Sequence, residues 1–281
     1  IPAGGGGRVG FDTPPAAAAT QPTFGQPAER FQRHPELYLS GDFCTMPRSK
    51  HPPTMTASNG SPAVLLVFLE NGGHVGGVAL PPWASQALDR FTQAYARVAV
   101  QLQARRRYDH IVVLEEEDAT AAHLWQVLLD AGDATVDVLM LVHGQPGYAC
   151  GHGDNRVGAD FFAGLRDLRT AGLAPFRLRA VYQMNCYGQS LAPEWLSIGA
   201  QAVNGSEGVN WLPEPSLSVF LRGWLGGQTF EEAVQDSYRA ASRLLGLIWH
   251  PQSGRAGVRQ PHDKIASSRM EVFGDEELRI G

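Results

Sequence analysis

Two apolar segments, each leading into a chemically reactive residue, constrain the fold of this chain more than any other feature. Residues 139–142 are followed directly by His143 and Gly144, and residues 178–183 are followed closely by Cys186. Apolar runs of this kind are typical of strands buried on both faces of a parallel sheet. Because neighbouring parallel strands end at the same edge of a sheet, we expect His143 and Cys186 to face each other there.

From residue 63 onward, strand patterns alternate with helix patterns. This alternation predicts an α/β fold with one mostly parallel sheet and helices on both faces. Strands are predicted over residues 63–70, 110–114, 137–142, 176–183, 202–204 and 270–280, the last interrupted at Gly274 and Asp275. Helices are predicted over about 88–102, 120–131, 159–171 and 191–198, with two more before residue 249, and the glycine-rich residues 145–158 are expected to form an exposed hairpin or loop.

Two helices carry more detailed predictions. Apolar residues at steps of three and four predict one buried helix face, made of Leu88, Phe91, Tyr95, Val98 and Leu102. Thr229 and Glu232 form a capping-box pattern at the start of the last helix.

Composition divides the chain at about residue 60. Residues 1–60 are rich in Pro, Gly and Ala and are interpreted as a linker or pro-segment, a plain flexible tail being the alternative, whereas residues 61–281 are expected to form the folded domain. A net charge of −5 gives no reason to expect nucleic acid or an anionic membrane as partner, and no apolar run is long enough to span a bilayer.

The cysteines indicate a reducing compartment. Their number, three, does not make a disulfide framework, which predicts a cytoplasmic protein with at least one free thiol. Abundant alanine and glycine suggest a bacterial source, and secretion of a trimmed precursor stays open. The oligomeric state is not predicted.

The paired His143 and Cys186 predict nucleophilic catalysis. A thiolate is a strong nucleophile, and a neighbouring histidine can activate it or protonate a leaving amine. Backbone N–H groups of Gly144 and Cys186 would stabilise the oxyanion formed during attack. No cofactor is needed for this chemistry.

Several motifs in this order resemble the caspase-like (clan CD) cysteine peptidases, especially bacterial CHAT, gingipain-type and metacaspase-like members. The motifs are His143-Gly144, residues 185–188, the strand at 198–205, the helices at 220–233, and residues 272–279, which are similar to a Gly-Asp-Pro-x-Leu-Arg ending with Glu276 in place of proline. The resemblance implies a three-layer sandwich over residues 61–281. It also implies a thiol endopeptidase acting on proteins or peptides, with His143 and Cys186 catalytic and Gly144 with Cys186 as the oxyanion hole.

Substrate-binding residues are predicted less directly. Met184 stands where metacaspases carry an acidic residue that selects basic side chains, so that preference does not transfer. Glu207, beside Ser206, is a candidate for selecting a basic side chain or else an exposed loop carboxylate. Asn71 is a candidate pocket wall or part of a turn. If the enzyme prefers basic residues, cleavage near Arg48 or Lys50 would mature it.

Other interpretations remain open. An α/β-hydrolase with a cysteine nucleophile would use a nucleophile elbow at Cys186 with Asp236 and either His250 or His262. A non-catalytic caspase-like scaffold would need neither residue for catalysis. Cys150, His152 and Asp154 give a zinc hypothesis, and Asp154 with Asn155 gives a hypothesis of calcium activation; the prediction adopted is that no metal is bound.

Overall fold

The computed structural model describes residues 62–70, 94–153, 155–210, 214–249 and 269–281. All of them belong to one compact unit, His51–Gly281. The predicted linker over residues 1–60 lies outside the described residues, as do Arg48 and Lys50. Among the helices described, none combines the length and the apolar character required to cross a membrane.

A six-stranded sheet forms the centre of the unit, in the order β2-β1-β3-β7-β8-β9. Neighbouring strands are parallel except β9, which runs antiparallel to β8. The predicted α/β class with a mostly parallel sheet is confirmed. The strands are β1 (Ala63–Glu70), β2 (His110–Glu115), β3 (Thr135–Val142), β7 (Arg177–Gln183), β8 (Ala202–Ser206) and β9 (Met270–Gly274).

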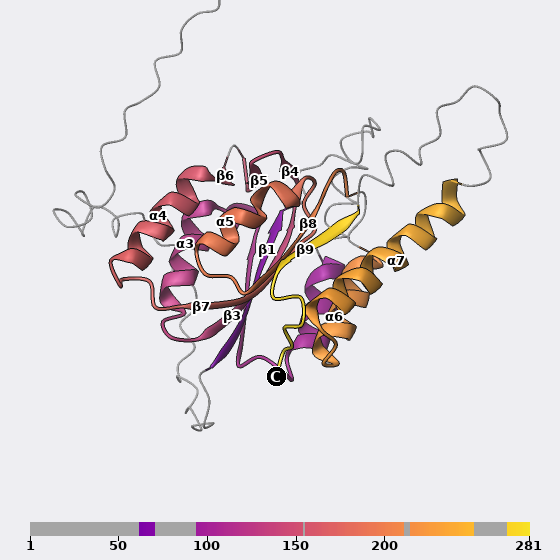
Figure 1. Ribbon diagram of the computed structural model, residues 1–281, viewed down its shortest axis with the longest axis horizontal. Coiled ribbons are helices and arrows are strands. Elements are labelled where there is room, and N and C mark those ends of the chain that lie inside the picture. The colour runs from indigo at the N-terminus through magenta and orange to yellow at the C-terminus, as the bar shows by residue number, and fades with distance from the viewer. Residues whose placement is uncertain (1–61, 71–93, 154, 211–213, 250–268) are drawn as a thin grey trace, which may run out of the picture. The chain divides into compact units, whose positions relative to one another are not determined.

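Helices cover both faces of this sheet, which gives three layers (Figure 1). Alternate residues of β1 point to opposite faces: Leu66 and Phe68 pack in one core cluster, and Leu65 and Val67 in the other. The first face carries α3 (Ala121–Asp130), α4 (Ala159–Thr170) and α5 (Ala192–Ser197), and the second carries α6 (Ser216–Leu225), α7 (Phe230–Trp249) and the helical residues 94–104. The short 3₁₀ turns are η2 (Glu116–Asp118) and η3 (Gly188–Leu191).

The glycine-rich segment after β3 folds into a small antiparallel sheet of β4 (Gly144–Gln145), β5 (Tyr148–Cys150) and β6 (Arg156–Gly158). Gly144 pairs with Ala149, and Ala149 pairs with Val157. These residues are buried in the first core cluster or against it. The pairing confirms the predicted hairpin. The hairpin is not exposed throughout as predicted, because Ala149 and Val157 are buried in the core.

The predicted buried face of the first helix is wrong. Tyr95, Val98 and Leu102 are 44%, 55% and 63% exposed, while Ala96 and Val100 point into the second core cluster. The buried face consists of the small residues Ala96, Ala99, Val100 and Ala104, so the largest apolar side chains do not mark the buried face of this helix. The two remaining residues of the predicted face, Leu88 and Phe91, lie outside the described residues.

The last predicted strand is too long. β9 ends at Gly274, whose φ of +91° belongs to the left-handed region, and residues 275–280 form no strand. A side chain at Gly274 would also overlap the carbonyl oxygen of Gln201. Glycine therefore turns the chain away from the sheet at this point.

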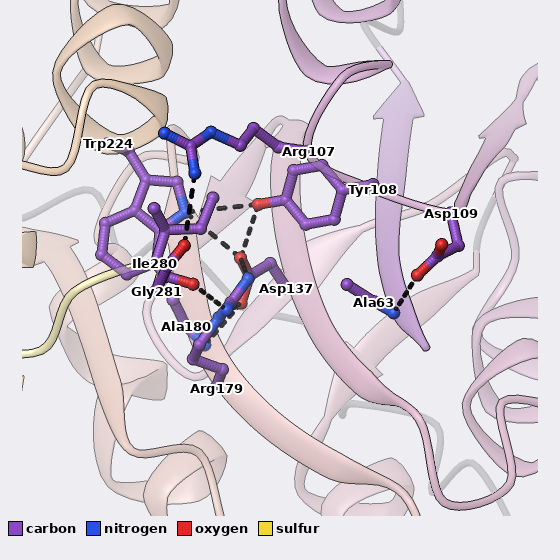
Figure 2. Close-up of polar contacts among 10 residues, drawn as sticks. All are labelled: Ala63, Arg107, Tyr108, Asp109, Asp137, Arg179, Ala180, Trp224, Ile280 and Gly281. Carbon is purple, nitrogen blue, oxygen red and sulfur yellow. Dashed lines mark hydrogen bonds and ion pairs between the residues drawn. The ribbon is translucent and has the colours of Figure 1, made fainter. Parts of the chain in front are cut away.

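A buried carboxylate joins several segments near the amino ends of the strands (Figure 2). Asp137 of β3 is 3% exposed and accepts hydrogen bonds from Tyr108 (2.5 Å) and Trp224 (3.2 Å). Arg179 of β7 donates to both carboxylate oxygens, at 3.0 and 2.8 Å, and also to the carbonyl of Ile280. Burial, followed by the charge of Asp137, raises the pKa of Tyr108 well above its ordinary value, so this hydroxyl remains a donor.

Candidate active site

His143 and Cys186 follow two strands that are direct neighbours in the sheet. β3 and β7 pair in parallel, so their carboxyl ends lie at one edge. His143 comes directly after β3, Cys186 comes shortly after β7, and both are half-buried. The structure therefore places the two residues on the same rim, which is the edge where parallel α/β sheets bind ligands.

Backbone groups surround the thiol of Cys186. Its sulfur donates to the carbonyl oxygen of Asn210 at a Sγ–O distance of 3.6 Å. Burial raises the pKa of this thiol, and backbone N–H groups near the sulfur, at Asn210, Cys186 itself and Gly144, oppose that rise. The resting thiol is consequently neutral, with the backbone N–H groups of Gly144 and Cys186 close to its sulfur.

His143 is held through its backbone. Its carbonyl oxygen accepts from the N–H of Cys150 at 2.8 Å, which continues the β4–β5 pairing by one residue. Among the hydrogen bonds of the described residues, none joins the imidazole of His143 to the thiol of Cys186. The pair thus shares an edge without a preformed contact, and such contacts commonly tighten only when substrate binds.

Gly144 is in direct contact with the loop that carries Cys186. A Cβ at this position would overlap the carbonyl oxygen of Cys186 and touch the side chain of Asn185. Only a residue without a side chain allows the backbone after β3 to lie this close to the backbone after β7. Gly144 therefore packs the histidine loop against the cysteine loop.

Ser190 links the two loops that carry His143 and Cys186. Its Oγ accepts from the N–H of Gly147, in the β4–β5 turn, at 2.8 Å. The same hydroxyl donates to the carbonyl of Tyr187 at 2.7 Å. One short side chain therefore fixes the spacing between the histidine loop and the cysteine loop. Ser190 was not predictable from the sequence, because nothing in its local pattern indicates a contact with Gly147, 43 residues earlier in the chain.

Side-chain amides replace backbone pairing where β7 and β8 separate. The backbone ladder of these strands ends at Val181 and Val203. Beyond it, Asn204 accepts from the N–H of Gln183 at 2.7 Å and donates to its carbonyl at 3.0 Å. The strands therefore diverge toward the rim without leaving these backbone groups unpaired, and the cysteine loop occupies the opening.

The predicted substrate-binding residues have different surroundings. Met184 is 6% exposed and packs in the second core cluster, and Ser206 is fully buried, its Oγ 2.9 Å from the carbonyl of Asn185. Both side chains support the cysteine loop from beneath. Glu207 is exposed, with its N–H bonded to the carbonyl of Arg269 at 3.1 Å, and Asn71 lies outside the described residues.

An acid–histidine pair, made of Glu70 and His152, lies on the same rim as His143 and Cys186. Glu70 ends β1, the neighbour of β3, and its carboxylate is 3.6 Å from Nδ1 of His152. The side chain of Glu70 is largely buried, whereas that of His152 is about half exposed. His152 was predicted only as part of the zinc hypothesis, and no role was predicted for Glu70. The position of Glu70 at the carboxyl end of a predicted strand could have indicated a place on this rim.

The described residues give little support to the α/β-hydrolase interpretation and to the metal hypotheses. A nucleophile elbow holds the nucleophile in a strained turn, but in this loop the positive φ of 56° belongs to Tyr187. Asp236 pairs with Arg239 on α7, and His250 and His262 lie outside the described residues. Within the described ranges no group of three or more His, Cys, Asp or Glu residues would hold a metal; Asp154, common to both metal hypotheses, falls in a gap.

Comparisons with known proteins give similarity at the level of structure. No protein-family model matches the sequence, and no curated protein matches it either. Solved structures similar to this chain include the Arg-specific cysteine proteinase gingipain R (RgpB), at 14% identity over 77% of this chain with a TM-score of 0.47. The complex of Porphyromonas gingivalis RgpB pro- and mature domains has 13% identity over 78% of this chain, with the same TM-score.

A third similar structure is pro-sf-caspase-1, with 11% identity, a TM-score of 0.44, and coverage of 84% of this chain and 97% of that one. The present chain spans 46% and 48% of the two gingipain chains. At these values the similarities carry no argument about activity, which depends on the residues of the site.

Proposed function

We propose that the protein is a cysteine endopeptidase that cleaves protein or peptide substrates through an acyl-enzyme on Cys186. The observation that carries this proposal is the convergence of four groups at one sheet edge: the half-buried thiol, the backbone N–H groups of Gly144 and Cys186 beside it, and His143 on the neighbouring strand end. A nucleophile, a proton carrier and oxyanion donors are the groups that acyl transfer requires.

The neutral thiol determines the order of proton transfers in the proposed reaction. As Sγ attacks the peptide carbonyl, its proton passes to the imidazole of His143, and the carbonyl oxygen becomes an oxyanion that accepts from the two backbone N–H groups. Collapse breaks the C–N bond, and His143 gives the proton to the leaving amine. Water then attacks the thioester, with His143 as general base, and releases the acid and the thiol.

Cleavage of a peptide library, run beside matched variants, tests the proposal. We expect Cys186→Ala to abolish cleavage and His143→Ala to lower kcat/KM at least about 10³-fold, because each loses a reacting group. His152→Ala is the matched control, since it removes a histidine from the same rim. It should keep most of the activity.

If no library peptide is cleaved, labelling of the thiol shows whether Cys186 is unreactive or whether the library lacks a suitable substrate. An acyloxymethyl ketone probe should label wild type and Cys150→Ala but not Cys186→Ala. Cleavage that survives in His143→Ala and is lost in His152→Ala would show that His152, paired with Glu70, is the general base instead of His143. Equal labelling of wild type and Cys186→Ala would end the proposal altogether.

A further inference from the structure

A pocket lies between α6 and α7. Its volume is about 530 Å³. Its walls carry Arg222 from α6, and Asp236, Arg239 and Arg243 from α7. Three guanidinium groups thus share one pocket with a single carboxylate, and none of the proposed catalytic residues lines it.

The carboxylate compensates only part of this positive charge. Asp236 pairs with Arg239 at 2.5 Å and accepts from Nε2 of Gln228 at 3.1 Å. Contact with Arg239, then with Gln228, lowers the pKa of Asp236, so it is ionised at neutral pH. Among the ion pairs of the described residues, none includes Arg222 or Arg243. The pocket therefore holds an excess of two positive charges.

The three arginines are exposed to solvent around this pocket, and their like charges repel one another. Arg239 and Arg243 stand four residues apart on α7, a spacing at which like charges destabilise a helix, and Arg222 adds to them from α6. Asp236 compensates one of the three charges through its pair with Arg239. An anion within the pocket would compensate the others, because guanidinium groups form bidentate, charge-assisted hydrogen bonds to phosphate.

The shape of the pocket suits a small ligand. Gly223 and Gly226 contribute to its lining, so part of the wall is bare backbone. At Gly223 the amide of Gln228 lies against the bare backbone, in the place that a side chain would occupy. The volume exceeds that of one phosphate group and lies within the usual range of small-molecule sites.

From these features we propose that the α6–α7 pocket binds a small phosphate monoester, its dianionic phosphate held by Arg222 and Arg243 with Arg239 beside them. The proposal is independent of the peptidase activity, because none of these residues belongs to the catalytic rim. Val219 and Ala240, which also line the pocket, would contact the ester's organic part.

Thermal unfolding with inorganic phosphate as probe tests the site, with sodium chloride adjusted to constant ionic strength. We expect the Tm of wild type to rise with phosphate and to saturate, because a ligand that binds only the folded state stabilises it. Arg222→Gln and Arg243→Gln should each weaken the apparent affinity about tenfold, and the double variant should show no phosphate-dependent rise.

Arg106→Gln is the matched control, since Arg106 is an exposed arginine elsewhere on the chain. It should behave as wild type. Line broadening of the phosphate ³¹P resonance gives a second readout that does not depend on the unfolding transition, and glycerol phosphate should bind at least as tightly as phosphate. An equal rise in wild type and double variant, or the same rise with sodium chloride alone, would overturn the proposal.

Discussion

At the scale of single residues, the site is built to hold a thiol rather than a preformed thiolate. Cys186 is half-buried, its sulfur donates to the carbonyl of Asn210, and no hydrogen bond to His143 stabilises the charged form among the contacts described. Ionisation in the resting protein is therefore unfavourable. Proton transfer to His143 is expected to accompany attack rather than precede it.

This arrangement predicts how the reactivity of Cys186 depends on pH. Because burial raises its pKa, the thiolate fraction, and with it the rate of alkylation by iodoacetamide, should increase with pH and reach half its maximum above the ordinary thiol value. The rate is measured by mass spectrometry of the Cys186 peptide, with Cys150→Ala removing the other described thiol. A midpoint near pH 6 would instead indicate a preformed ion pair with His143.

Gly144 gives the sharpest steric prediction. In Gly144→Ala the new methyl would overlap the carbonyl of Cys186, so the cysteine loop must move and the oxyanion donors with it. We expect kcat/KM to fall about 100-fold, with a stability loss of about 1–3 kcal/mol. Peptide hydrolysis and urea unfolding measure the two effects separately. Unchanged kinetics would show that this close approach plays no part in catalysis.

At the scale of elements, the start of α7 shows local sequence deciding local structure. Glu232 accepts from the N–H of Thr229 at 2.9 Å, and Thr229 accepts from the N–H of Glu232 at 3.1 Å. The reciprocal pair is the capping box that the sequence predicted. It satisfies backbone donors that the first turn of a helix otherwise leaves free.

Removing this cap should affect stability alone. Thr229→Ala is expected to lower the free energy of unfolding by about 1 kcal/mol, because one donor at the helix start loses its acceptor. Labelling of Cys186 by the active-site probe should remain at the wild-type rate, since α7 begins away from the catalytic rim. Chemical denaturation and probe kinetics on the same preparation check both statements.

Elements whose signals are local were predictable from the sequence, and those set by distant packing were not. β1, β3 and β7 follow from their apolar runs, and with them the edge shared by His143 and Cys186. The face of the helix at 94–104 did not follow, because hydrophobic periodicity weights large side chains while the sheet accepts alanines. Ser190 and Asn204 act on partners far along the chain, and short-range patterns carry no such information.

At the scale of the whole molecule, Asp137 is the point at which separate segments meet. Its carboxylate joins β3 to β7 through Arg179 and to α6 through Trp224, and Arg179 reaches on to Ile280 (Figure 2). The side chains that combine here are far apart in sequence. Neither the partners nor the burial of this carboxylate was predictable from local patterns.

Breaking this ion pair should destabilise the entire unit. Arg179→Met leaves the buried carboxylate of Asp137 without its cation and the carbonyl of Ile280 without its donor. We expect a loss of about 3–5 kcal/mol in the free energy of unfolding, measured in urea. Arg177→Met is the matched control, because Arg177 is exposed and its side chain donates to the carbonyl of Asp133, with no ion pair among the described residues. A loss equal to that of the control would show that the network contributes little.

The Asp137 network lies at the opposite ends of the central strands from His143 and Cys186. The groups that secure the chain gather toward the start of the central strands, while the candidate chemistry stands where those strands finish. Substitutions of His143 or Cys186 themselves are therefore expected to act on the reaction more than on folding, whereas Gly144, packed against the cysteine loop, affects both. Such a scaffold can lose its reacting groups and persist as a folded inactive form.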